Sequence, residues 1–126
     1  MTKTLFIFPG QGAQYRGMGH DLFKDHDAVR RTYEEANDIL GYNIAETSFR
    51  DPEEKLMLTR YTQPALLTHS VSCLRLFAEQ AGEHFRPDAA AGHSLGEYSA
   101  LVAAGSLDFS TALELVQKRG ELMGKF

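Results

Sequence analysis

The chain has 126 residues, 43% of them hydrophobic and 10% aromatic, which is typical of a globular domain with a core and excludes a disordered chain. The formal net charge is −4 and no basic run is longer than a pair, as at Arg30-Arg31, so neither nucleic acid nor an anionic membrane is an expected partner. The single cysteine, Cys73, excludes an intrachain disulfide and is expected to pack rather than react. With no apolar run of signal-peptide or membrane-spanning length, a cytoplasmic protein is expected.

The first half of the chain predicts one strand followed by helices. The apolar run at residues 5–8 ends at Pro9-Gly10, as a parallel strand buried on both faces would, and a glycine-rich loop follows at 10–14. Residues 27–40 alternate apolar and charged positions at helical spacing and stop at Gly41, which predicts an amphipathic surface helix. Asp51, Pro52 and two glutamates resemble the first turn of another short helix.

The second half alternates helix and strand. A long helix is predicted over residues 62–81, ending at Gly82, and its apolar positions cover more than one stripe, so it should be largely buried. Residues 89–92 predict a short strand, and a helix of small residues should run from Ser94 to near Gly105. The last helix should begin near Asp108 or Ser110 and pass Leu122. Strands alternating with helices, without repeats or a linker, indicate an α/β fold.

A candidate nucleophile lies between the second predicted strand and the helix after it. Gly92-His93-Ser94-Leu95-Gly96 matches G-x-S-x-G, the sharp strand-to-helix turn that exposes a serine hydroxyl. The glycines fit because side chains would clash in so tight a turn. The helix start directs backbone N–H groups and a positive dipole end toward an oxyanion at the serine. We therefore interpret Ser94 as a nucleophile rather than a simple turn serine.

A second oxyanion donor is expected from the loop after the first strand. Parallel strands direct their carboxyl ends to one rim of the sheet, so Gly10-Gln11-Gly12 should lie beside the Ser94 turn. The alternatives for this loop are a phosphate-binding turn and a merely tight turn. The loop lacks both the P-loop pattern and the third glycine of a dinucleotide-binding loop.

The last predicted helix carries an arginine on an apolar face. At 100° per residue, Arg119 lies in the middle of the face formed by Ala112, Leu115, Val116, Leu122 and Met123. Burying a guanidinium without a partner costs several kcal/mol, so this position requires an anion. The spacing leaves two alternatives open: a buried Asp or Glu of the protein, or a substrate carboxylate held by the planar arginine fork.

Four segments, in this order, resemble malonyl-CoA:acyl carrier protein transacylases and the acyltransferase domains of polyketide synthases. They are FPGQGAQ at residues 8–14, TQPAL at 62–66, GHSLGEYSA at 92–100 and Arg119-Gly120. The resemblance implies the α/β-hydrolase-like, parallel-sheet large subdomain of the acyltransferase fold, incomplete here and without the ferredoxin-like small subdomain. Residues 1–126 would then be the N-terminal part of one acyltransferase domain. Such a fragment should leave apolar surface uncovered and be inactive alone.

The resemblance also implies roles for individual residues. Ser94 would carry the acyl group as an ester, and the backbone N–H groups of Gln11 and Leu95 would form the oxyanion hole. Arg119 would bind the malonyl carboxylate, which decides between the two alternatives in favour of substrate. Gln63 would line the site.

The implied reaction transfers malonyl from malonyl-CoA through Ser94 to the phosphopantetheine thiol of an acyl carrier protein. The partners would be malonyl-CoA and the carrier protein, with no metal and no bound cofactor. Both malonyl and methylmalonyl, and both fatty acid and polyketide biosynthesis, stay open. Two other readings also stay open: an acyl hydrolase or thioesterase using the same serine, and a non-catalytic fragment that docks carrier proteins.

The general base is a point where the chain departs from this pattern. The family's base is a histidine well beyond the nucleophile, and no histidine follows His93 in these 126 residues. His93 itself would shape the turn rather than act as base. The other histidines are expected to be structural or exposed; they are His20, His26, His69 and His84.

Overall fold

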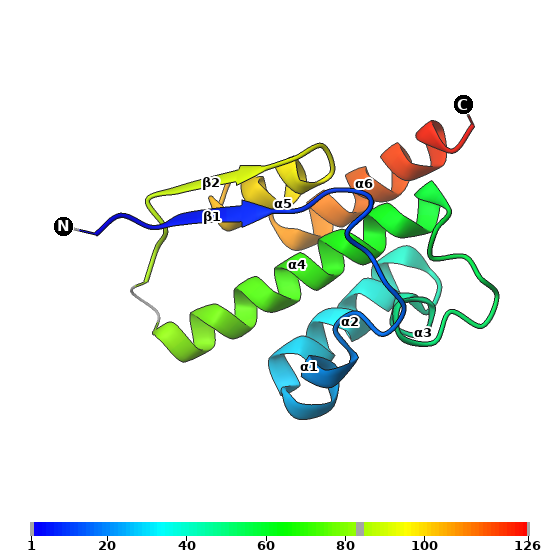
Figure 1. The fold of residues 1–126 in the computed structure, drawn as a ribbon, viewed down its shortest axis with the longest axis horizontal. Helices are drawn as coiled ribbons and strands as arrows, with labels where there is room; N and C mark the ends of the chain where they lie inside the picture. The colour runs from blue at the N-terminus through cyan, green and yellow to red at the C-terminus, as the bar shows by residue number, and fades with distance from the viewer. Residues whose placement is uncertain (1, 83–84, 126) are drawn as a thin grey trace.

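The computed structural model describes residues 2–82 and 85–125, which form an α/β fold (Figure 1). In chain order the elements are β1 (Leu5–Phe8), α1 (His20–Asp25), α2 (Asp27–Leu40), α3 (Ile44–Phe49), α4 (Thr59–Ala81), β2 (Ala89–Gly92), α5 (Gly96–Ala103) and α6 (Phe109–Met123). The strands pair in parallel, with Leu5 opposite Ala89 and Phe8 opposite Gly92. The predicted α/β class and both predicted strands are confirmed.

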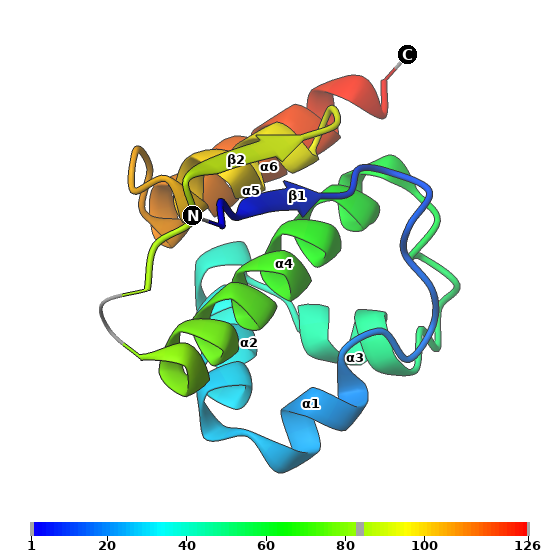
Figure 2. The same ribbon diagram turned by 60° about the vertical axis from the view of Figure 1, so that its left-hand side comes forward.

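The helices lie on one side of this small sheet, and α4 lies between the sheet and α1–α3 (Figures 1 and 2). Phe6 on β1 contacts the α4 residue Phe77 edge-on, with ring centroids 5.4 Å apart. The opposite face of β1 is open in the described structure: Leu5 is 54% exposed and Ile7 is 73% exposed. The prediction that this strand is buried on both faces was therefore wrong. A continuous apolar run fits a covered strand, but it does not reveal which faces other elements cover.

The hydrophobic core lies around α4, which packs against both α2 and α6. The apolar stripe of α2 is fully buried, as its periodicity predicts, through Val29, Tyr33 and Ala36. From α6, Leu113 and Val116 complete the same core. The central, largely buried position predicted for the long helix is confirmed.

Most helix ends follow the predicted signals. The α2 helix spans Asp27–Leu40 and ends at Gly41, and α4 ends at Gly82 but begins at Thr59, before the predicted start. Asp108 caps α6, because its carboxylate accepts the backbone N–H of Thr111 at 2.7 Å. Two short helices, α1 and α3, were not predicted, since six residues each are too few to show a period.

The predicted helix at Asp51-Pro52-Glu53-Glu54 was wrong, because this segment forms turns. Asp51 has a φ of 47°, and its carboxylate accepts the backbone N–H groups of Lys55 at 2.7 Å and Leu56 at 3.1 Å. An aspartate before a proline satisfies nearby N–H groups in a turn as well as at a helix start. The sequence pattern therefore does not distinguish the two.

Large apolar side chains are exposed on several elements, in agreement with the expectation of uncovered apolar surface. Besides those on β1, they include Phe77, Leu101, Leu115, Leu122 and Met123. Among the residues that the structure describes, no helix is both long and apolar enough to cross a membrane.

Candidate active site

Ser94 lies at the tip of the sharp turn between β2 and α5. Its φ is 56°, a left-handed conformation that non-glycine residues adopt at a cost, and its side chain is exposed. A Cβ at Gly92 would overlap the Gly96 carbonyl, and a Cβ at Gly96 would overlap the Phe8 carbonyl. The turn exists only because both positions lack a side chain. The predicted geometry of G-x-S-x-G is confirmed.

The glycine-rich loop after β1 lies directly against this turn. The His93 N–H donates to the Phe8 carbonyl at 3.3 Å, and a Cβ at Gly10 would overlap the His93 carbonyl. The loop is held by the Gln14 side chain, which accepts the Gly12 N–H at 2.7 Å. The prediction that the glycine-rich loop and the Ser94 turn lie side by side at one rim of the sheet is therefore confirmed.

Among the backbone N–H groups at this junction that have no acceptor within residues 2–82 and 85–125 are those of Gln11 and Leu95. Leu95 stands just before α5, and its side chain is only 1% exposed, which fixes the backbone at that point. The Gln11 side chain donates to the Thr59 hydroxyl at 3.1 Å, tying the loop to the start of α4. An oxyanion hole needs free, fixed donors of this kind.

Arg119 of α6 extends to Ser94. Its guanidinium donates to the Gln63 side-chain oxygen at 2.6 Å and to the Ser94 hydroxyl at 3.1 Å. Within the described residues Arg119 forms no ion pair with a carboxylate, so the alternative of an Asp or Glu partner finds no support there. The predicted apolar face is only partly buried. Ala112 and Val116 lie in the core, whereas Leu115, Leu122 and Met123 are 44–47% exposed.

Gln63 and Tyr98 surround the arginine. Gln63 is 1% exposed, and its amide also donates to the Met123 sulfur at 3.3 Å, so its position is fixed. The Tyr98 ring lies beside the guanidinium, 5.6 Å from ring centroid to Cζ. The sequence interpretation gave Tyr98 and Met123 no role at the site, although it placed Met123 on the same helix face as Arg119. Their spacing could have revealed them, because Tyr98 is four residues after Ser94 and Met123 four after Arg119.

The histidines differ in their surroundings. His93 is exposed and adjoins Gly10, and its role in shaping the turn stays a prediction. His69 is partly buried in α4, and desolvation lowers its pKa. Cys73 lies 3.6 Å from the His69 ring, and burial raises the pKa of its thiol, in line with a packing residue. His84 lies outside the described residues.

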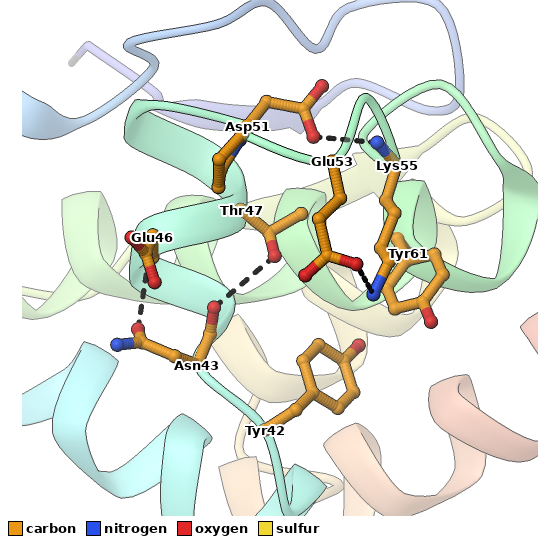
Figure 3. A pocket seen from close by; sticks show the side chains of 9 residues that line it. Tyr42, Asn43, Glu46, Thr47, Asp51, Glu53, Lys55 and Tyr61 are labelled. Carbon is orange, nitrogen blue, oxygen red and sulfur yellow. Dashed lines mark hydrogen bonds and ion pairs between the residues drawn. The ribbon is translucent and has the colours of Figure 1, made fainter.

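A separate polar pocket of about 180 Å³ lies between α3 and residues 51–61 (Figure 3). Two of its charged groups form an ion pair, in which the Lys55 ammonium lies 2.8 Å from the Glu53 carboxylate. None of the residues around Ser94 lines it. In the described part of the chain, no three His, Cys, Asp or Glu side chains are arranged to hold a metal ion.

Replacing Gly92 with alanine should displace the turn, because the new Cβ would overlap the Gly96 carbonyl. We expect a loss of about 2–3 kcal/mol in the free energy of unfolding. Gly124→Ala is the matched control and should lose far less, since Gly124 has an ordinary helical φ of −68° and a Cβ there would lie 3.2 Å from the Gly120 carbonyl oxygen without overlapping it. Urea unfolding midpoints of the two variants would measure the difference; equal midpoints would contradict the steric argument.

Comparison with known proteins supports one family. The acyl transferase domain family matches residues 5–126. The malonyl CoA-acyl carrier protein transacylase of Bacillus subtilis is 47% identical over 125 residues, which is 99% of this chain and 38% of that protein.

Two solved structures extend the comparison. The crystal structure of MCAT from Streptococcus pneumoniae superposes with a TM-score of 0.90 at 50% identity, covering 98% of this chain and 39% of the other. A malonyl-transacylase in complex with a type II polyketide acyl-carrier protein gives a TM-score of 0.91 at 47% identity, covering 98% and 40%. The chain thus has the acyltransferase fold and spans about two fifths of the length of these relatives. It belongs to the acyl transferase domain family.

Proposed function

We propose that this chain is the nucleophile-bearing part of a malonyl-CoA:acyl carrier protein transacylase, acting in fatty acid or polyketide biosynthesis. One observation carries the proposal: an arginine without a carboxylate partner among the described residues donates to the hydroxyl of the serine at the turn, at 3.1 Å. A malonyl ester on Ser94 would hold its free carboxylate a few bonds from the ester oxygen. Arg119 would be within reach of that carboxylate.

In the first half-reaction, the Ser94 oxygen attacks the thioester carbonyl of malonyl-CoA. The negative charge on the carbonyl oxygen is held by the N–H groups of Gln11 and Leu95. Collapse of this intermediate breaks the carbon–sulfur bond, releases coenzyme A as its thiol and leaves malonyl on Ser94. The serine proton must pass through a general base, and no described histidine hydrogen-bonds the Ser94 hydroxyl.

In the second half-reaction, the phosphopantetheine thiol of an acyl carrier protein attacks the Ser94 ester by the reverse steps, which restores the serine hydroxyl. Coenzyme A enters only as the thioester substrate, and phosphopantetheine arrives on the carrier protein. The chemistry needs no resident cofactor. The names of the relatives support both partners, because they are malonyl CoA-acyl carrier protein transacylases.

Arg119 supports malonyl as the acyl group. Its planar fork can pair with a carboxylate through two hydrogen bonds, and a neutral acyl chain would leave the cation without that partner. A neutral acyl-CoA should therefore react more slowly. Gln63 would hold the guanidinium in place from the α4 side.

The proposal extends to the organisation of the protein. Residues 1–126 would form the N-terminal part of one acyltransferase domain, within its α/β-hydrolase-like large subdomain and without the ferredoxin-like small one. The partial coverage of the relatives supports this assignment. A cytoplasmic location follows from the same assignment, because the substrates are coenzyme A thioesters.

The test uses the whole protein as its gene encodes it. It is mixed briefly with malonyl-CoA, its intact mass is measured, and the modified peptide is identified. We expect one malonyl group on Ser94, which moves to a phosphopantetheine-bearing acyl carrier protein when that protein is added. Release of malonate to water with an unlabelled carrier would identify a hydrolase instead. A protein that never acquires an adduct would overturn the enzymatic proposal in favour of a docking fragment.

A further inference from the structure

Arg119 is surrounded by groups that carry no negative charge. The Gln63 side-chain oxygen accepts one N–H at 2.6 Å, and the Ser94 hydroxyl accepts another at 3.1 Å. The third neighbour is the ring of Tyr98, with its centroid 5.6 Å from Arg119 Cζ. That distance is within the range at which an aromatic ring attracts a cation. The guanidinium is thus held without a counter-charge among the described residues.

An aromatic ring and a carboxylate affect a guanidinium differently. A carboxylate partner would take up the N–H groups of the planar fork and neutralise the charge. A ring attracts the cation through its quadrupole and takes up no N–H group. Because only two of the five N–H groups of Arg119 are used by described residues, the others stay available to an incoming anion.

The position of Tyr98 links the arginine to the nucleophile. Tyr98 lies in the first turn of α5, and its N–H donates to the Leu95 carbonyl at 3.1 Å. Its side chain is partly buried and packs against the core cluster, which limits the positions of the ring. The turn that places Ser94 therefore also places the ring, and the ring contacts an arginine that arrives from α6.

We propose that Tyr98 is a positioning residue that holds the Arg119 guanidinium beside Ser94 through its ring, and so sets the preference for acyl groups that end in a carboxylate. This inference rests on the proposed function. The ring is the part that matters, and the phenol hydroxyl has no role in it.

The test compares variants of the whole protein by the rate at which Ser94 is acylated by malonyl-CoA and by acetyl-CoA, followed by intact mass. Tyr98→Leu removes the ring, and we expect malonyl acylation to fall about tenfold while acetyl acylation changes less than about twofold. Tyr98→Phe keeps the ring and should retain both rates within about twofold. Tyr61→Leu is the matched control, because the Tyr61 ring lies beside Arg60 and Lys55 and has no recorded contact with Arg119 in the described structure.

A second set of variants measures the coupling directly. In an Arg119→Ala background, Tyr98→Leu should cause no further loss of malonyl preference, since the ring then has no guanidinium to hold. If Tyr98→Leu does not fold, Tyr98→Met replaces it, because the unbranched, flexible methionine side chain adapts to an irregular gap and also has no ring. If Tyr98→Leu lowers the acylation rates with malonyl-CoA and acetyl-CoA equally, or lowers neither, the inference is overturned. The proposed function still stands in that case, provided that the wild type acquires a malonyl group. A wild type that acquires no malonyl group overturns both.

Discussion

Ser94→Ala is expected to abolish the malonyl adduct and to lower the rate of malonyl transfer by at least about 10⁴-fold. The proposed mechanism passes through an ester on this hydroxyl, and the free N–H groups of Gln11 and Leu95 have no covalent intermediate to stabilise without it. Transfer from malonyl-CoA to a phosphopantetheine-bearing carrier protein, followed by the mass of the carrier, measures the loss.

Ser99→Ala provides the matched control for this change. Ser99 lies in α5, the helix that follows the Ser94 turn, and is 1% exposed, and its hydroxyl has no hydrogen-bond partner among the described residues. Removing an unpaired buried hydroxyl should leave folding and transfer nearly unchanged. Transfer by Ser94→Ala at a rate near that of Ser99→Ala would mean that the acyl group does not pass through Ser94.

The turn around Ser94 could be predicted from sequence because steric exclusion determines it. A Cβ at Gly92 or Gly96 would overlap backbone atoms, so the spacing of two glycines around a serine already implies the geometry. The neighbouring loop followed from the same logic, since parallel strands end at one rim. These predictions depend on local backbone constraints, which a short segment contains in full.

Predictions that depended on distant partners were less successful. The strand at Leu5–Phe8 was recognised, but the exposure of Leu5 and Ile7 depends on what lies over the sheet, which the run itself does not specify. The aspartate of the segment at 51–54 satisfies N–H groups in a turn, although the same residues fit a helix start. Where a local sequence pattern is compatible with two structures, packing against other parts of the chain determines which one forms.

The surroundings of Arg119 include both a successful prediction and a missed contact. Its spacing along α6 correctly indicated an arginine beside apolar residues, and the resemblance to the transacylases pointed to Gln63 as well. The contact between Tyr98 and Arg119 was missed, because an aromatic residue in a helix of small residues is usually interpreted as a residue of the hydrophobic core. Only the crossing of α5 and α6 brings that ring to the guanidinium.

Arg119→Ala is expected to reverse the substrate preference of the proposed enzyme. Removing one partner of a hydrogen-bonded charge pair costs about 2–5 kcal/mol, and because Arg119 is only partly buried we expect a loss of about 100-fold in malonyl acylation of Ser94. Acetyl acylation should stay the same or rise, since no unpaired cation then faces the neutral chain. The rate of malonyl acylation in Arg119→Lys should lie between those of the wild type and Arg119→Ala, because an ammonium keeps the charge but lacks the planar fork.

Arg60→Ala is the control for general loss of positive charge, since Arg60 is exposed at the start of α4 and lies over Tyr61. It should leave the ratio of malonyl to acetyl acylation unchanged. The ratio is the informative quantity, because a variant that only distorts the turn at Ser94 would slow both substrates alike. A ratio that stays at the wild-type value in Arg119→Ala would show that the carboxylate is bound elsewhere, and the assignment of malonyl as the acyl group would lose its main support.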